Sequence, residues 1–121
     1  MGISAWCDIS VADADSLCEF YAQVCGWQRE AVPMNGYNDY VMKDSDGKVV
    51  GGICHAAGPN SALPPVWLMY FAVDNLDVAL NAVVKQGGEM LGNVRQFGDG
   101  RYCAIRDVAG ACCALYETAE K

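Results

Sequence analysis

Two stretches of the chain, ISVAD at residues 9–13 and FAVDN at residues 71–75, have the same pattern of apolar and polar side chains. Each stretch alternates like a β-strand, reaches an Asp or Asn, and runs into an amphipathic segment. The first of these segments ends at Gly26 and the second at Gly87-Gly88. Val11 and Val73 are offset by 62 positions (73 − 11). This spacing indicates an internal repeat, which decides the architecture before any other feature.

Later parts of the two halves repeat at almost the same distance. Tyr40 and Tyr102 are offset by 62 positions (102 − 40), and the DSDG turn at 44–47 and the DVAG turn at 107–110 by 63 (107 − 44). Three separate features at nearly one spacing predict two copies of one structural module.

Each half follows the same order of predicted elements. Asp13 and Asn75 are suited to cap a helix, because their side chains accept hydrogen bonds from the first free amides. Apolar residues at helical spacing then predict helices at about 14–25 and 76–86. Three strands follow each helix, at 28–33, 38–43 and 48–55 in the first half and at 89–95, 101–106 and 111–117 in the second. We therefore predict one domain over residues 1–121, with module one at about 4–55, a proline-containing linker at 56–65 and module two at about 66–117.

Composition excludes several classes of function. Hydrophobic residues make up 53% of the 121-residue chain, as in globular proteins, and no apolar run is long enough to span a membrane. The formal net charge of −7 and the eight basic residues argue against nucleic-acid binding, which requires clustered Lys and Arg. The acidity favours solubility, and it also favours a cationic ligand. The first residues lack the pattern of a signal peptide, so we expect a cytoplasmic protein.

The seven cysteines do not form a recognisable metal or disulfide motif. Their number is odd, no CxxC pair occurs, and most lie in apolar runs. We interpret them as small core side chains in a reducing compartment, with a catalytic thiol as the alternative.

The order of several short motifs resembles the glyoxalase I / bleomycin-resistance / extradiol-dioxygenase (vicinal oxygen chelate) superfamily. The motifs are Val11-Ala12-Asp13, Phe20-Tyr21, Gly26-Trp27, the WLMYFAV stretch at 67–73, Gly87-Gly88, Gly100-Arg101, Asp107 and Gly110-Ala111. The resemblance implies an α+β fold in which two βαβββ modules form a curved mixed sheet, a half-barrel cleft with the helices on the outer face. It also implies a small-molecule ligand and a homodimer.

Metal-using members of this superfamily place one ligand on the first and one on the last strand of each module. Counting from the capping residues and from the Asp-x-x-Gly turns puts these four places at Trp6, Gly51, Leu68 and Ala114. None of these side chains has a lone pair suited to a divalent metal. We therefore expect no metal and no other cofactor.

Strand alternation extends these four places to two complete faces, because every second residue of a strand points the same way. The cleft face is predicted to carry Trp6, Asp8, Ser10, Gly51, Ile53, His55, Leu68, Tyr70, Ala72, Cys112, Ala114 and Tyr116. The face under the helices is predicted to carry Cys7, Ile9, Val11, Val50, Gly52, Cys54, Met69, Phe71, Val73, Cys113 and Leu115.

Two ionisable residues on the predicted cleft face are the candidates for chemistry. Asp8 is unusual in the middle of a strand, and it either faces a wet cavity or pairs with a partner such as Arg101 or a tyrosine hydroxyl. His55 is either a rim residue or a functional one. Asp8 and His55 are the candidate general bases, and together with Cys112 they form an alternative, displaced metal site. The predicted ligand-binding residues are Trp6, Asp8, Tyr40, His55, Trp67, Tyr70 and Tyr116, with Tyr37 as a further aromatic neighbour.

These residues leave three classes of function open. The first is a metal-independent protein that binds an apolar or aromatic, and in one version cationic, small molecule. The second is a lyase, epimerase or dioxygenase with an atypical metal site or with Asp8 or His55 as general base. The third is an interaction protein in which dimerisation itself is the function.

Overall fold

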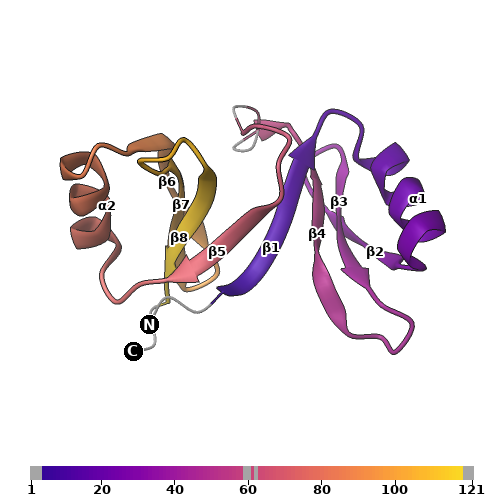
Figure 1. The fold of residues 1–121 in the computed structure, drawn as a ribbon. Helices are drawn as coiled ribbons and strands as arrows, with labels where there is room; N and C mark the ends of the chain where they lie inside the picture. Colours follow the sequence, from indigo (N-terminus) through magenta and orange to yellow (C-terminus); the bar gives the residue numbers. More distant parts are fainter. Residues whose placement is uncertain (1–3, 59–60, 62, 119–121) are drawn as a thin grey trace. The chain divides into compact units, whose positions relative to one another are not determined.

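The computed structural model describes residues 4–58, 61 and 63–118, and these residues form two helices and eight strands (Figure 1). The first half contains β1 (Ser4–Val11), α1 (Ala14–Cys25), β2 (Gln28–Pro33), β3 (Asn38–Lys43) and β4 (Val49–His55). The second half contains β5 (Leu68–Ala72), α2 (Leu76–Lys85), β6 (Glu89–Phe97), β7 (Gly100–Arg106) and β8 (Cys112–Glu117). The bounds of the predicted elements agree with these to within one or two residues. In the predicted linker the described residues contain no β-strand, and residues 59, 60 and 62 lie outside the described part.

The chain divides into two compact units. The N-terminal unit is Cys7–Trp67, and the C-terminal unit is the described part of Leu68–Lys121 together with that of Met1–Trp6. In the N-terminal unit the strand order is β2-β3-β4-β1, with β1 parallel to β4 and the other neighbours antiparallel. The C-terminal unit has the corresponding order β6-β7-β8-β5, with β5 parallel to β8. The predicted α+β fold with two βαβββ modules is confirmed.

In the N-terminal unit, helix α1 packs against one face of the sheet. Asp13 caps it by accepting a hydrogen bond from the Ser16 amide at 3.1 Å, and Gly26 ends it in a left-handed conformation with φ of 74°. The core beneath the helix consists of Ile9, Ala14, Cys18, Met42 and Ile53. Three aromatic rings extend this core, with Tyr21 stacked on Trp27 and with Trp67 edge-on to both rings.

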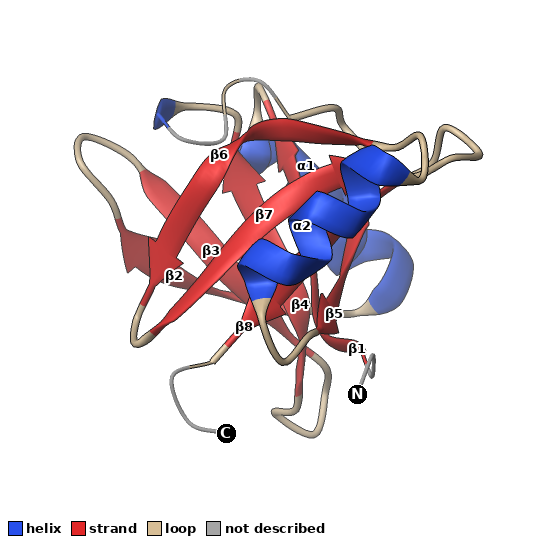
Figure 2. Ribbon diagram, turned by 90° about the vertical axis from the view of Figure 1, so that its left-hand side faces the viewer, coloured by secondary structure: helices blue, strands red, loops and turns tan. Residues whose placement is uncertain are grey.

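In the C-terminal unit, helix α2 lies across β7 on the corresponding face (Figure 2). Its N-terminus has two side-chain acceptors, because Asn75 accepts from the Val78 amide and Glu117 accepts from the Leu76 amide at 2.7 Å. Arg101 holds Glu117 in place and also contacts Asp77 of the helix. Beneath the helix lies a second core of Leu76, Leu80, Cys103 and Ile105.

Strand pairing shows which residues of the two units are equivalent. The row Asp8–Gly52–Val41 in the N-terminal unit corresponds to the row Tyr70–Ala114–Ala104 in the C-terminal unit. The β1 and β4 positions are offset by 62 from their counterparts, and those on β3 by 63. Tyr102 is therefore the counterpart of Asp39, and Tyr40 is the counterpart of Cys103. The predicted correspondence of Tyr40 with Tyr102 is wrong by one residue.

A β-bulge in β4 accounts for the change of the offset from 63 on β3 to 62 on β4. Met42 pairs with Gly51 but Lys43 pairs with Val49, so Val50 is an extra residue without a partner on β3. An extra residue shifts every later side chain of a strand by one place. The equivalent of Ala114 is consequently Gly52, not Gly51.

The bulge also corrects the predicted face of β4. Ile53 lies in the core under α1 and pairs with Ile9, so Gly51, Ile53 and His55 belong to the helix-covered side of the strand. Val50, Gly52 and Cys54 belong to the other side. For β5 and β8 the prediction is confirmed, since Val73, Cys113 and Leu115 pack against the core under α2.

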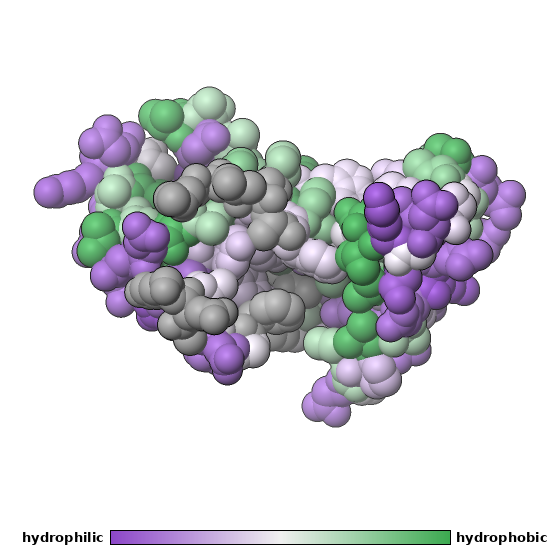
Figure 3. Space-filling model, turned by 90° about the horizontal axis from the view of Figure 1, so that it is seen from below, coloured by the Kyte–Doolittle hydropathy of each residue, from purple (hydrophilic) through white to green (hydrophobic). Residues whose placement is uncertain are grey.

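Apolar groups remain at the surface of both units. Val49, Val84 and Val108 are exposed, and the space-filling view shows apolar areas interrupting the polar surface (Figure 3). Within the described residues, neither helix is both long and apolar enough to cross a membrane. All seven cysteines are free thiols.

Candidate functional site

Each sheet has one face that carries no helix of its own unit, and these two faces contain most of the predicted site residues. In the C-terminal unit this face, called here the tyrosine face, consists of side chains from alternate positions of β5, β6, β7 and β8. Its central members are Tyr70, Ala72, Tyr102, Ala104, Ala114 and Tyr116. In the N-terminal unit the corresponding acidic face is centred on Asp8, Ser10, Asp39 and Cys54.

The tyrosine face groups three phenol rings around small side chains. The rings of Tyr70 and Tyr102 have centroids 5.7 Å apart, and Tyr102 pairs across the strands with Tyr116. Ala104 and Ala114 form the next row, and both are buried, as is Tyr70. Aromatic side chains of this kind can stack against a flat apolar ligand.

Charged residues lie along the β6 side of the tyrosine face. Arg95 is paired with Tyr102, and Glu89 is paired with Arg106. Glu89 and Arg106 also form an ion pair at 3.3 Å. Arg95 was not among the predicted site residues, because its place opposite a tyrosine depends on a bulge in β6 that the alternation pattern does not contain.

The acidic face contains two carboxylates and a thiol. Asp39 is 8% exposed and accepts a hydrogen bond from the His55 amide at 2.9 Å. Burial, followed by the charges of Asp8 and Asp39, raises the pKa of the Cys54 thiol far above its usual range. Cys54 is therefore a neutral thiol that donates to Asp39, which does not favour a nucleophilic role. Asp8 is half-buried, and strand alternation places it opposite the core residue Ile9, on this face.

His55 belongs to the helix-covered side of β4 by strand alternation. Its Nδ1 lies 2.7 Å from the Asn38 carbonyl oxygen, and its ring meets Tyr37 edge-on with centroids 5.6 Å apart. The contact to a carbonyl requires Nδ1 to be the protonated nitrogen, so in the neutral ring Nε2 is the acceptor. The strand register gives His55 the side of Ile53, but its Nδ1 also lies 4.0 Å from Oδ1 of Asp39 on the acidic face, so the grouping of Asp8 with His55 stays a prediction.

Tyr40 and Trp67 also lie on the helix-covered side. The Tyr40 hydroxyl donates to Asp15 of α1, and the Arg29 guanidinium lies 5.3 Å from the centre of the Tyr40 ring. The Trp67 indole donates to the Tyr21 hydroxyl at 3.1 Å. Both side chains support packing around α1, and neither lies on the acidic face.

The four places that the superfamily uses for metal ligands carry no suitable donor. With the register corrected, these places are Trp6, Gly52, Leu68 and Ala114, and none has an imidazole, carboxylate or thiolate group. Among the described residues no group of three or more His, Cys, Asp or Glu side chains converges on one point. The residues present do not fit the metal that this fold commonly holds. Asp8, His55 and Cys112, the alternative metal ligands, do not form such a group among the described residues either.

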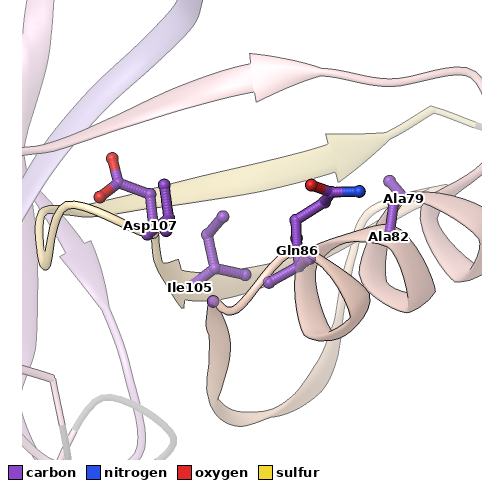
Figure 4. A pocket seen from close by; sticks show the side chains of 8 residues that line it. Ala79, Ala82, Gln86, Ile105 and Asp107 are labelled. Carbon is purple, nitrogen blue, oxygen red and sulfur yellow. The ribbon is translucent and has the colours of Figure 1, made fainter.

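One hollow lies away from both faces, between the C-terminal half of α2 and the end of β7 (Figure 4). It has a volume of about 370 Å³ and is lined mainly by apolar groups, with Gln86 and Asp107 as its polar members. The full set is Ala79, Ala82, Val83, Gln86, Gly88, Ile105, Asp107 and Val108. Its lining contains none of the predicted ligand-binding or catalytic residues.

Comparison with known proteins identifies the class of protein. Residues 3–112 match the Glyoxalase/Bleomycin resistance protein/Dioxygenase superfamily, and the chain belongs to this family. It is 31% identical over 119 residues to the Mycobacterium tuberculosis protein named "Putative glyoxylase CFP32", and 30% identical over 128 residues to the anthracycline biosynthesis protein DnrV of Streptomyces peucetius. These matches cover 96% and 95% of this chain but 46% of each relative, so the chain spans just under half of their length.

Solved structures show the same fold at lower sequence identity. Methylmalonyl-CoA epimerase of Streptomyces coelicolor, solved with 2-nitronate-propionyl-CoA, aligns with a TM-score of 0.62 at 17% identity over 98% of this chain and 99% of its own. A glyoxalase I mutant of Zea mays aligns with a TM-score of 0.65 at 16% identity over 99% of this chain and 45% of its own. At such identities the likeness extends to the fold alone.

Proposed function

We propose that this protein is a metal-independent binding protein for apolar or aromatic small molecules, and that the tyrosine face is its main contact surface. The proposal is supported by a difference between neighbouring positions on the tyrosine face. The family's ligand places on this face, Leu68 and Ala114, have no donor atoms, whereas the neighbouring positions carry Tyr70, Tyr102 and Tyr116. Aromatic side chains bury a large area per residue and tolerate many flat ligands.

Two measurements on the purified protein test the two parts of this proposal. Treatment with a chelator should leave the thermal unfolding midpoint unchanged, because no side chain at the family's ligand places can bind a metal ion. A midpoint that falls and is restored by one specific divalent ion would refute metal independence.

Binding is tested with 2-naphthamide, a flat neutral compound, by isothermal titration calorimetry and thermal shift. A ligand that binds only the folded state must raise the unfolding midpoint. Replacing Tyr116→Leu should weaken binding by about tenfold, since loss of one aromatic contact is worth about 0.5–1.5 kcal/mol beyond the buried area. The matched control is Phe20→Leu, an exposed aromatic residue of α1, which should bind as the wild type does. Equal affinity of all three proteins would remove the tyrosine face from the proposal.

The alternative function is an enzyme of the lyase, epimerase or dioxygenase type with Asp8 as general base. What favours it is the half-buried carboxylate of Asp8 on the acidic face, together with a fold shared with methylmalonyl-CoA epimerase. A general base needs reach to a substrate proton and a suitable pKa. Exchange of the α-proton of thioester or α-keto acid substrates in deuterated water, lost in Asp8→Asn, would replace the binding proposal by this one.

The proposal also includes a homodimer in the cytoplasm, in line with what the family resemblance implies. Light scattering at micromolar concentration should give about twice the chain mass of 13.0 kDa. A monomer mass at every accessible concentration would refute this part alone.

A further inference from the structure

The hollow beside α2 lies where the C-terminal unit lacks large side chains that the N-terminal unit has. The caps Asp13 and Asn75 are offset by 62 positions (75 − 13), and so are the buried helix residues Cys18 and Leu80 (80 − 18). By this offset three lining residues of α2 have larger counterparts on α1, since Ala79 corresponds to Leu17, Ala82 to Phe20 and Val83 to Tyr21. A fourth lining residue, Gly88, directly precedes β6 as Trp27 directly precedes β2.

In the N-terminal unit the larger side chains form an aromatic cluster at the corresponding corner. The rings of Tyr21 and Trp27 are stacked with centroids 5.1 Å apart, and the ring of Phe20 meets Tyr21 edge-on, also at 5.1 Å. Leu17, Tyr21 and Trp27 pack against the core under α1. The corner between helix and sheet therefore accommodates aromatic rings in this module. In the C-terminal unit the smaller Ala, Val and Gly leave the space open, as large-to-small replacements do.

The size and the lining of the hollow suit a small organic molecule. Its volume of about 370 Å³ lies within the range of about 300–1,000 Å³ that is typical of small-molecule sites. Alanine, valine and isoleucine side chains line most of it, and Figure 4 shows Ile105 between the two polar members, Gln86 and Asp107. Such a lining favours a ligand that is mainly apolar and has one polar group.

Asp107 gives the hollow a negative charge in a fixed position. Its Oδ1 accepts hydrogen bonds from the amides of Ala109 and Ala111 at 2.8 and 3.0 Å, which hold the carboxylate in the turn after β7. No hydrogen bond from the described residues reaches its Oδ2. Among the residues that line the hollow, Asp107 is the only charged one, and the adjacent Arg106 forms an ion pair with Glu89. The charge at this margin therefore complements a cation.

We propose that the hollow beside α2 binds arylalkylamines, with the aromatic ring against Ala79 and Ala82 and the ammonium group against Oδ2 of Asp107. The ring takes the place that aromatic side chains take in the N-terminal unit. The positive charge of the ligand also suits a chain whose formal net charge is −7. The lining shares no residue with the tyrosine face, so this inference does not rest on the proposed function.

The location of the site is tested by NMR, from the amide signals of residues 82–88 and 105–108 during titration with 2-naphthylmethylammonium. In the wild type these signals should shift saturably. The double variant Ala79→Leu/Ala82→Phe puts the side chains of the N-terminal unit into the hollow and should abolish the shifts. The matched control is Val78→Leu, which enlarges an exposed side chain of α2 outside the lining and should bind as the wild type does.

The charge preference is tested by the same substitution in two equivalent turns. Asp107→Asn keeps the oxygen that accepts from the two backbone amides and removes the charge. The cation should then bind about threefold to fivefold more weakly, as expected for an exposed ion pair, whereas the neutral 2-naphthamide should bind equally well to both proteins. Asp44→Asn is the control, because Oδ1 of Asp44 accepts from the Asp46 and Lys48 amides in the corresponding turn of the N-terminal unit. It should leave binding unchanged.

Three results would overturn the inference. They are the absence of saturable shifts in the wild type at millimolar concentration, unchanged binding by the folded double variant, and an equal loss of affinity in Asp107→Asn and Asp44→Asn. Circular dichroism shows whether each variant is folded, and Ala79→Leu alone repeats the test if the double variant unfolds. Tyr116→Leu, which tests the tyrosine face, should leave the shifts around the hollow unchanged, so the two proposals can fail separately.

Discussion

The tyrosine face and the acidic face occupy equivalent places in two copies of one module, yet they carry opposite chemistry. Strand pairing matches Tyr70 with Asp8, Tyr102 with Asp39, and Tyr116 with Cys54. At the edge strands, Leu91 and Arg95 of β6 correspond to Glu30 and Val32 of β2. Three phenols beside an arginine on one face thus stand where two carboxylates and a thiol stand on the other.

The helix-covered sides of the two units resemble each other more than the helix-free faces do. Met42 and Ile105 are equivalent, both are buried, and each lies in the core beneath its helix. Asp13 and Asn75 are equivalent and both cap a helix. The difference between the two sides shows where the fold depends on particular residues. Packing against a helix restricts side-chain volume, whereas a face without a helix of its own can change its chemistry while the module still folds.

Each unit has its own bulge, and the two have different consequences. The bulge in β4 lies within the sheet, next to β1, and it reverses the faces of Gly51, Ile53 and His55. The bulge in β6 lies on the edge strand and moves Arg95 along the strand without changing its face. Both bulges change which side chains lie on a helix-free face. The β4 bulge exchanges the two sides of its strand, and the β6 bulge moves Arg95 along its strand.

The largest effect is expected from adding a side chain at Gly51, where the backbone of β4 lies close to the backbone of β1. A Cβ on Gly51 would lie 2.5 Å from the Cys7 carbonyl oxygen, an atom that belongs to the backbone of the neighbouring strand and cannot rotate away. Gly51→Ala should therefore lower the free energy of unfolding by about 2–3 kcal/mol, as overpacking of a well-packed site does. Urea denaturation followed by circular dichroism measures this change.

The matched control is the equivalent position of the other unit, where Cys113 packs against the core under α2. Cys113→Ala removes one buried sulfur atom and should cost about 1 kcal/mol. A smaller loss for Gly51→Ala than for Cys113→Ala would contradict the close approach at the β4 bulge.

A change of intermediate size is expected in the reactivity of the Cys54 thiol on the acidic face. Burial is the main reason why the pKa of Cys54 is raised, and the Asp8 carboxylate is the second. Asp8→Asn keeps the size of the side chain and removes the charge, so the pKa of Cys54 should fall and its thiolate fraction should rise. Alkylation of Cys54 by iodoacetamide at mildly alkaline pH, followed by peptide mass spectrometry, should become several-fold faster.

Cys113 in the C-terminal unit is the internal control for this experiment. Its pKa is also raised by burial, but the charges that act on it are those of Asp107 and Cys112. The alkylation rate of Cys113 should be the same in the wild type and in Asp8→Asn. An unchanged rate at Cys54 would show that Asp8 does not act on the thiol.

The smallest effect concerns the charge of the capping side chains, since Asp13 is ionisable and Asn75 is neutral. Hydrogen bonds from the Ser16 hydroxyl and amide lower the pKa of Asp13 below its usual value of 3.8, whereas Asn75 does not titrate. A lowered pKa in the folded state stabilises the protein above the unfolded-state pKa, and this stabilisation is lost as the pH falls through the folded-state value. Asp13→Asn should therefore be slightly less stable than the wild type at neutral pH.

The difference between the two proteins should shrink below about pH 4, when Asp13 in the wild type becomes protonated. Urea denaturation of both proteins at neutral pH and at acidic pH measures this change. A difference that is constant with pH would mean that the charge of Asp13 does not contribute to the cap.

Much of the fold follows from short-range patterns in the chain. The caps at Asp13 and Asn75, the helix end at Gly26 and the two Asp-x-x-Gly turns each act over a few residues, so the sequence alone predicts the bounds of α1, β2 and β3 without error. The face assignment of β8 and β5 was also predictable, because neither strand contains an extra residue between its turn and its core positions. Resemblance to a known family then indicated the four positions that lack metal donors, of which the position on β4 moved from Gly51 to Gly52 because of the bulge.

Only the tertiary structure decided which side chains lie on the two helix-free faces. A bulge arises where one strand pairs with its neighbour, and an alternating pattern such as Val49 to His55 reads the same with or without it. Cys54 and His55 were therefore assigned to the wrong sides of β4. Tyr40 and Trp67 lie outside β4, and their place beside α1 is set by tertiary packing. Arg95 reaches Tyr102 for the same reason, because the register of β6 is set by its pairing with β7. Local sequence determines which elements form, and the hydrogen bonds between strands determine which side chains meet.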